Sequence, residues 1–208
     1  MRIYFLILSV ILLGSCKKKD LEFRMQGKVT DLSFNKGLDG GIIEIRELGS
    51  NGAISGNPIV SATLDAGGNY DVTFKRKSVI KYLIHIKKDN YFEVDKEIPF
   101  GDLQVNETNT YNFQTTAKSW VKLHFINQAP SSADDQLRFI KQDGKEGCEL
   151  CCPDTDRFVN GTKDSIFYCI NDANTSYSYF FWSENPSDFG EESITTIAFD
   201  TVEIVKNW

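Results

Sequence analysis

Hydrophobic and polar residues alternate over short stretches of the chain, and glycine, asparagine, aspartate and proline separate these stretches at roughly ten-residue spacing. Alternation with a period of two is typical of strands that bury one face. It predicts strands at 23–30, 41–48, 59–64, 70–75, 79–87, 108–114, 119–126, 136–141, 165–170, 176–182 and 194–205. No stretch keeps a 3.6-residue period, so helices are expected to be short or absent. The pattern therefore predicts an all-β protein with sandwich architecture.

The first hydrophobic run is too short to span a bilayer. It covers about eleven residues behind Arg2, whereas a membrane-spanning helix needs about 20. The run fits the hydrophobic region of a secretory signal peptide. The sequence LGSC that follows at 13–16 resembles the lipobox of bacterial lipoproteins, in which the cysteine is lipidated and becomes the first residue of the mature chain. We therefore expect a lipoprotein signal peptide at 1–15, lipidation of Cys16 and a tether at 16–21.

The lipobox resemblance implies that the membrane is a partner through a lipid anchor. Two or three acyl chains hold a protein stably at a bilayer, where a single chain binds only marginally. Lys17 stands at the position where aspartate usually signals retention in the inner membrane, which favours the outer membrane. The periplasmic or surface face is left open. A short membrane anchor or an ordinary secreted protein is the alternative.

Length and charge limit the rest of the chain. The 208 residues of the chain, less the signal peptide, leave room for one large or two small β domains. The formal net charge of −6 becomes −7 once Arg2 is removed, which argues against a nucleic-acid partner because such a partner calls for a clustered basic face. We expect a boundary near Thr116, with domains at 22–116 and 117–208. The short linker predicts that they abut, and a groove between them is one place for a ligand.

Three segments of the first half resemble one family of β-sandwiches. They are GKVTD at 27–31, GGIIEI at 40–45 and LDAGGNY at 64–70. In this order they resemble the carboxypeptidase regulatory-like, transthyretin-like family, although Leu38 and Asp39 stand where that family commonly has a proline. The resemblance implies a transthyretin-like sandwich over roughly 22–115 and brings no catalytic residue. The second half is expected to form another sandwich of transthyretin-like or immunoglobulin-like type.

Four cysteines remain once Cys16 carries lipid. They are Cys148, Cys151, Cys152 and Cys169. An even number in an oxidising envelope indicates two disulfides, with three possible connectivities. Because the adjacent Cys151 and Cys152 would be strained as partners, we expect one of them to pair with Cys169 and the other with Cys148. Closing a loop of about 17 residues to Cys169 should stabilise the fold by roughly 3 kcal/mol.

Two other uses of these cysteines are considered. A zinc site needs four converging ligands, and the C-x2-C spacing plus a further cysteine supplies part of such a set. The expected compartment and the lack of a second C-x-x-C argue against it. A redox-active C-x-x-C would start a helix after a strand, whereas Pro153 and Asp154 continue the segment as a turn. No metal and no cofactor are expected.

No catalytic motif stands out in the sequence. His85 and His124 are predicted to lie on the solvated faces of strands, and neither stands at a known triad spacing from a serine, cysteine or carboxylate. The calcium-loop pattern fails after Asp154 because Phe158 falls where an oxygen ligand is needed. The acidic stretch 184–192 is expected to form a solvated loop, and a glycosidase pair of carboxylates is the alternative. The chain is therefore expected not to be an enzyme.

Aromatic residues fall on both faces of the strand predicted at 176–182. Tyr177, Tyr179 and Phe181 share one face, and Phe180 and Trp182 share the other. One face must belong to the core, and burial of both faces is one interpretation. The other is a ligand-binding row made of Tyr177, Tyr179, Phe181 and Trp182, because exposed rings can stack on sugars or contact a protein.

Two function hypotheses follow. The first is a non-enzymatic, lipid-anchored envelope protein that acts as a structural or protein-interaction module, by analogy with the use of β-sandwich modules as spacers and docking surfaces. The second is a glycan-binding module of the outer membrane that uses exposed aromatic residues. The partner would accordingly be a protein or a glycan.

Overall fold

The structure is a computed structural model that describes residues 21–49, 53–54, 56–77, 79–128, 135–161, 164–185 and 187–208. The predicted signal peptide, the lipidation site Cys16 and all of the tether except Leu21 lie outside these residues. Within the described ranges, no helix is long and apolar enough to cross a membrane. In these ranges the regular structure is almost entirely strand, with two short 3-10 helices, η2 (Phe100–Asp102) and η3 (Glu149–Cys151). The all-β prediction is confirmed.

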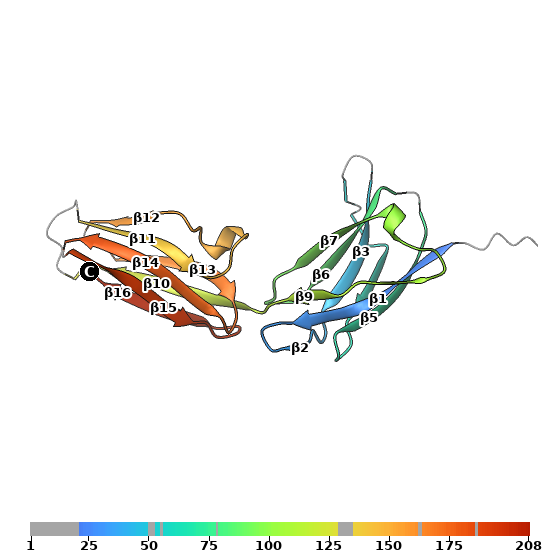
Figure 1. The fold of residues 1–208 in the computed structure, drawn as a ribbon, viewed down its shortest axis with the longest axis horizontal. Helices are drawn as coiled ribbons and strands as arrows, with labels where there is room; N and C mark the ends of the chain where they lie inside the picture. Colours follow the sequence, from blue (N-terminus) through green and yellow to red (C-terminus); the bar gives the residue numbers. More distant parts are fainter. Residues whose placement is uncertain are drawn as a thin grey trace, which may run out of the picture.

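The first half of the chain forms one pair of sheets, here called the first sandwich (Figure 1). Its strands are β1 (Glu22–Asp31), β2 (Lys36–Gly37), β3 (Ile42–Leu48), β4 (Val60–Thr63), β5 (Asn69–Lys75), β6 (Lys81–Lys87), β7 (Val94–Pro99), β8 (Thr108–Thr110) and β9 (Phe113–Thr115). One sheet has the order β2-β1-β5, and β8 and β9 pair in parallel with β1. The facing sheet has the order β4-β3-β6-β7.

The second half forms another pair of sheets, the second sandwich. Its strands are β10 (Lys118–Ile126), β11 (Gln136–Asp143), β12 (Arg157–Asn160), β13 (Ser165–Asp172), β14 (Ser176–Glu184), β15 (Ser187–Thr195) and β16 (Thr201–Asn207). One sheet has the order β13-β10-β16, in which β10 and β16 are parallel, and the facing sheet has the order β12-β11-β14-β15. This sheet pairing agrees with the predicted division near Thr116, and the domain limits themselves stay a prediction.

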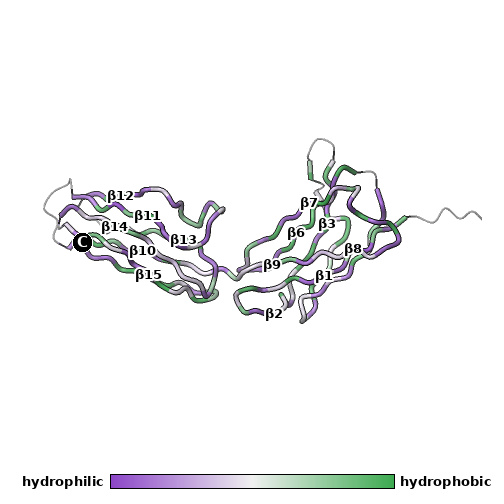
Figure 2. The backbone as a smooth tube through the Cα atoms, in the orientation of Figure 1, coloured by the Kyte–Doolittle hydropathy of each residue, from purple (hydrophilic) through white to green (hydrophobic). Residues whose placement is uncertain are grey.

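Each sandwich has its own hydrophobic core, as strand alternation requires. In β5, Tyr70, Val72 and Phe74 point inward and are buried, while the residues between them are exposed. In β10, Val121 and Phe125 point inward and are buried in the second core. Figure 2 shows hydrophobic and hydrophilic positions mixed along the strands of both sandwiches, without a long hydrophobic run. The cores therefore come from period-two patterning.

At one corner of the first sandwich, the segments 27–31 and 64–70 that carry the family resemblance meet residues 37–38, which come just before the third such segment. The amide of Val29 donates to the carbonyl of Gly68 over 2.8 Å, and the amide of Leu38 donates to the carbonyl of Val29 over 2.9 Å. Gly68 has a φ of 77°, and a Cβ there would lie 2.3 Å from the Val29 oxygen. A Cβ on Gly37 would lie 2.0 Å from the oxygen of Gly67. Glycine is required at this corner because three backbone segments come into direct contact.

Several predicted strands have different limits. The strand predicted at 79–87 begins at Lys81, and the one predicted at 108–114 is divided into β8 and β9. The strand predicted at 194–205 is wrong, because residues 196–200 form a connection between β15 and β16, which belong to different sheets. A change of sheet needs a turn, and no glycine or proline marks this one.

The structure contains edge strands that the pattern did not predict. They are β7 and β12, together with most of β15, which covers the stretch expected to be an acidic loop. All three lie at sheet edges; β7 and β15 are rich in exposed polar or charged residues, and β12 is only four residues long. Charged residues at an edge discourage pairing with other chains. They also remove the hydrophobic signal from which strands are predicted, so the loop prediction for 184–192 is wrong.

The two sandwiches are joined end to end through a very short connection. Only Thr116 and Ala117 separate β9 from β10. Ala117 is fully buried, its amide donates to the Ser33 hydroxyl over 2.9 Å, and its carbonyl accepts from the amide of Ala173 over 2.9 Å. The side-chain amide of Asn174 donates to the Ser33 carbonyl over 3.0 Å. Both polar groups of the linker residue Ala117 are therefore used in holding the sandwiches together.

Aromatic rings from both sandwiches pack against each other at the same junction. Phe199 of the second sandwich stacks on Phe34 of the first, with ring centroids 5.9 Å apart and an interplanar angle of 22°. Phe199 also contacts Tyr91 at 5.5 Å, and the Tyr91 hydroxyl donates to the buried Asp31 carboxylate over 2.8 Å. Ala173 and Ala198 of the second sandwich belong to the hydrophobic cluster of the first. The junction is thus continuous with a hydrophobic core.

Candidate functional site

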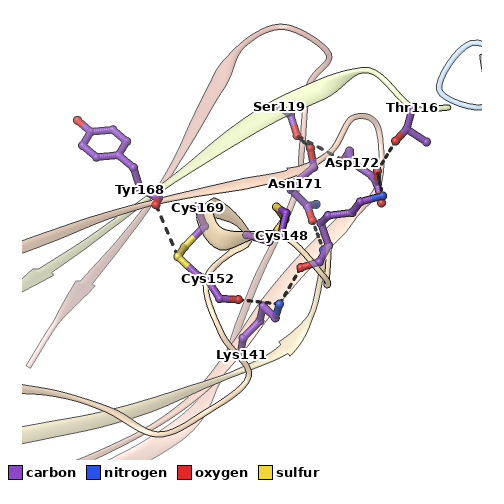
Figure 3. The surroundings of a disulfide bond; sticks show 11 residues. Thr116, Ser119, Lys141, Cys148, Cys152, Tyr168, Cys169, Asn171 and Asp172 are labelled. Atoms are coloured by element: carbon purple, nitrogen blue, oxygen red, sulfur yellow. Dashed lines mark hydrogen bonds and ion pairs between the residues drawn. A yellow bond between two sulfur atoms is a disulfide. The ribbon is translucent and has the colours of Figure 1, made fainter. Parts of the chain in front are cut away.

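The cysteine-rich loop is closed by two disulfides (Figure 3). Cys148 pairs with Cys151 across η3, and Cys152 pairs with Cys169 on β13. The expected arrangement is confirmed, and the structure decides which of the adjacent cysteines pairs with Cys169. All four thiols are consumed, so this arrangement leaves no thiolate for the zinc alternative. The loop is stapled to the sheet instead.

Lys141 holds this loop in place through two hydrogen bonds. Its side chain is buried, and its ammonium group donates to the carbonyls of Lys145 and Cys152 over 2.7 and 2.8 Å. The Lys145 ammonium in turn lies 3.0 Å from the Asp172 carboxylate and 4.4 Å from the ring centroid of Phe92, a residue of the first sandwich. The stapled loop therefore also contacts the junction.

The residues considered for catalysis are engaged in surface pairs. His85 lies 2.8 Å from Asp95 on the neighbouring strand, and His124 lies 3.2 Å from Glu203. Both histidines are on outward faces, as predicted. Among the described residues, no group of three or more histidine, cysteine or acidic side chains is placed to hold a metal ion.

A polar hollow of about 460 Å³ lies on the first sandwich beside β1 and β5. It contains two carboxylates, Asp65 and Asp71. The Asp65 carboxylate accepts hydrogen bonds from Asn69 and Gly67, which lower its pKa, and Asp71 is paired with Arg24, which also lowers its pKa. Both carboxylates are therefore stabilised as anions, which does not suit a general acid.

Three of the four aromatic residues proposed for ligand binding are core residues. Tyr177, Tyr179 and Phe181 are at most 3% exposed and pack in the second core. Burial raises the pKa of Tyr177 to about 12, because the phenolate would have to form away from water. The prediction of a binding row at these three residues is wrong, since the inward face of β14 carries them. Trp182 is 37% exposed on the opposite face.

The exposed face of sheet β12-β11-β14-β15 carries a different row of side chains. Strand register places Arg138 opposite both Phe158 and Trp182, and it places Trp182 opposite Phe189. Phe158 is 50% exposed and Phe189 is 70% exposed. We call Phe158, Arg138, Trp182 and Phe189 the aromatic row; at the usual strand spacing it spans about 14 Å.

Ring contacts hold the aromatic row in place. The Arg138 guanidinium lies 4.5 Å from the centroid of the Trp182 ring, and Asp156 accepts hydrogen bonds from Arg138 over 2.7 and 2.9 Å. Phe180 fills the next row, with its ring centroid 4.5 Å from that of Trp182 and 6.5 Å from that of Phe189. Large rings are thus fixed on an exposed sheet face.

Two carboxylates flank the aromatic row on its own face. Glu184 is two residues from Trp182 on β14, and Glu191 is two residues from Phe189 on β15. Both are exposed, and neither pairs with a cation among the described residues. We call Glu184 and Glu191 the acidic rim. Sequence reasoning missed Phe158 and Phe189 because their strands were not predicted.

Comparisons with known proteins give only distant likenesses. No protein-family model and no curated protein sequence matches the chain. Similar solved structures include a streptococcal ancillary pilin, with 11% identity, a TM-score of 0.36 and coverage of 89% of this chain and 62% of that one. They also include the shaft pilin SpaA of Lactobacillus rhamnosus GG, with 10% identity, a TM-score of 0.32 and coverage of 90% and 97%.

The chain also resembles the minor pilin GBS52 of Streptococcus agalactiae, with 9% identity, a TM-score of 0.34 and coverage of 89% and 94%. It spans 34% of the length of the Bacillus anthracis TIE protein. These likenesses are too remote to assign a family. The lipoprotein and carboxypeptidase regulatory-like resemblances therefore stay predictions.

Proposed function

We propose that this chain is a non-enzymatic, lipid-anchored protein of the cell envelope that acts as a structural or protein-interaction module. In this role the two sandwiches form a stiff spacer, and the lipid on Cys16 holds one end of it at the outer membrane. The observation that carries the proposal is the junction, in which Ala117 is buried, its amide is bonded to Ser33 of the first sandwich and its carbonyl is bonded to Ala173 of the second. A linker fixed in this way transmits orientation, which a flexible tether does not.

The direction of the chain supports the same role. Figure 1 shows that β1 begins at the end of the first sandwich that points away from the second, and that the C-terminus lies at the far end of the second. An anchor before β1 would therefore hold the second sandwich, with its aromatic row and stapled loop, away from the bilayer. The glycan-binding alternative loses three of its four named residues to the core.

The spacer is tested by distance measurements between spin labels. Labels introduced by unnatural amino acids at Lys96 on β7 and Ser193 on β15 leave the disulfides intact, and both positions are exposed. We expect a single narrow distance distribution. A broad distance distribution that becomes narrow only when the sample is cooled would refute a stiff spacer.

The anchor is tested separately in cells. The natural sequence should incorporate radiolabelled fatty acid and sediment with outer-membrane fractions, and Cys16→Ser should lose both properties. Protease added to intact cells then shows whether the second sandwich lies on the outer surface. Fractionation of the Cys16→Ser variant with the membrane, in the absence of lipid, would contradict the proposed anchor.

A further inference from the structure

The aromatic row leaves three large rings, those of Phe158, Trp182 and Phe189, exposed side by side on one sheet face. Exposed apolar patches with polar rims are typical of interaction sites. Tryptophan and arginine, which together form the centre of this row, are enriched among the residues that contribute most to protein interfaces. The row lies on sheet strands fixed by register, so its side chains are already in place before any partner binds.

Charge is distributed unevenly between the two halves of the chain. Residues 117–208 contain 8 lysines or arginines and 15 aspartates or glutamates, which gives a net charge of −7. Residues 22–116 contain 11 lysines or arginines and 13 aspartates or glutamates, which gives a net charge of −2. On the exposed face itself, Arg138 is matched by Asp156, so Glu184 and Glu191 remain as unbalanced negative charges. The half of the chain that carries the aromatic row therefore has a strongly negative field.

We propose that the aromatic row and the acidic rim together bind a basic protein surface, whose lysine or arginine side chains alternate with aliphatic ones. The aliphatic groups would pack on Phe158, Trp182 and Phe189, and the cations would meet Glu184 and Glu191. The faces of the aromatic rings also attract cations, as Arg138 over Trp182 already shows. Complementary charge speeds encounter and selects among partners. This inference rests on the proposed interaction function and names the chemistry of its partner.

The same charges disfavour the other occupants of this face. A second copy would bring an equal negative charge against it, and anionic lipid headgroups would be repelled in the same way. A neutral glycan could stack on the rings but would gain nothing from a net charge of −7. A basic protein surface is the occupant that uses both the rings and the carboxylates.

The test uses the full chain in phosphatidylcholine nanodiscs and three defined probes. These are a twelve-residue peptide alternating lysine and valine, its glutamate and valine counterpart, and a neutral glucan hexasaccharide. We expect the lysine peptide to bind at least about tenfold more tightly than either other probe, and to weaken as salt rises from low to high concentration. Equal or tighter binding of the hexasaccharide or the glutamate peptide would overturn the proposal.

Two matched variants locate the binding. Phe189→Ser removes the most exposed ring of the aromatic row, and Tyr168→Ser removes a ring that is 62% exposed on β13 of the opposite sheet. Binding of the lysine peptide should weaken about tenfold in Phe189→Ser and change less than about twofold in Tyr168→Ser, with equal thermal stability in both. Similar losses in both variants would mean non-specific attraction and would overturn the assigned surface.

The acidic rim is tested by replacing Glu184 and Glu191 together with glutamine, beside a control that replaces Glu22 and Glu107 of the first sandwich in the same way. Only the first pair should weaken peptide binding and flatten its dependence on salt. The spin-label distances of the same samples report the spacer independently. If the natural sequence does not bind the lysine peptide but keeps a narrow distance distribution, this inference is rejected and the proposed spacer still stands.

Discussion

The amide of Ala117 donates to the hydroxyl of Ser33 over 2.9 Å, and this contact joins the linker of the two sandwiches to the turn after β1. The donor is fully buried, so water does not replace the hydroxyl when it is removed. Ser33→Ala should therefore lower the free energy of unfolding by about 1–3 kcal/mol, the usual cost of a buried polar group without a partner. Urea unfolding measures this change.

The matched control for Ser33→Ala is Ser61→Ala, at an exposed position of β4. It should change stability by less than about 0.5 kcal/mol. Ser33→Ala should also broaden the distance distribution between the two sandwiches, whereas Ser61→Ala should not. Equal effects of the two variants would show that the junction does not depend on this hydrogen bond.

Phe199 contributes to the junction in a backbone conformation that disfavours it. Its φ is 64°, in the left-handed region, which costs a residue with a side chain about 1–2 kcal/mol. Both Phe199→Ala and Phe199→Gly remove the ring that stacks on Phe34. Because only glycine relieves the backbone, Phe199→Gly should be more stable than Phe199→Ala by about 1 kcal/mol in urea unfolding. The opposite order would contradict a strained backbone at this position.

Gly68 and Gly40 separate conformational strain from steric overlap. Both have positive φ, 77° at Gly68 and 69° at Gly40. A Cβ on Gly40 would meet nothing within 4 Å, whereas one on Gly68 would lie 2.3 Å from the Val29 oxygen. Gly40→Ala should cost about 1 kcal/mol, and Gly68→Ala should cost more than about 3 kcal/mol or prevent folding. Calorimetry of the two variants measures the difference, and equal costs would contradict the packed corner.

The two disulfides should differ in their contribution to stability. The Cys152–Cys169 bond closes a loop with a sequence separation of 17, and the Cys148–Cys151 bond closes one with a separation of 3. In the chain-entropy model, removing the first pair by alanine substitution costs about 3 kcal/mol and removing the second costs about 2 kcal/mol. Urea unfolding of each double variant tests this order. A larger loss from the Cys148 and Cys151 pair would contradict the entropic account.

The buried tyrosines should make the folded protein less stable at high pH. Burial raises the pKa of Tyr177 to about 12, and burial together with the Glu192 carboxylate raises the pKa of Tyr179. Because the folded-state pKa exceeds the unfolded value of about 10, their contribution is complete below pH 10 and is lost as pH rises toward 12. Each such group adds a slope of up to about 1.4 kcal/mol per pH unit in that range.

Urea unfolding at pH 8, 9, 10 and 11 measures this slope, and absorbance at 295 nm reports the phenolates. Tyr177→Phe should reduce the slope above pH 10 and leave the curve flat below it. The same stability at pH 8 and pH 11 would contradict the burial of these hydroxyls.

The sequence by itself determined the class of fold and most of the strands. Period-two alternation identifies β5 and β10 because every second residue enters a core. The four cysteines, in a protein expected in the oxidising cell envelope, indicate two disulfides. The structure was needed to decide whether Cys151 or Cys152 pairs with Cys169. These two cysteines are adjacent, so their sequence separations from any other cysteine differ by only one residue.

Only the tertiary structure decided which surfaces are available for function. The sequence shows aromatic residues on both faces of β14, but it does not say which face meets the other sheet, and the row expected at Tyr177 proved to be core. The aromatic row joins residues from four strands, of which β12 is too short and β15 too polar to be predicted from the pattern. Local patterning fixes which residues share a strand face, whereas register and sheet packing, which depend on contacts distant in sequence, fix which face remains exposed.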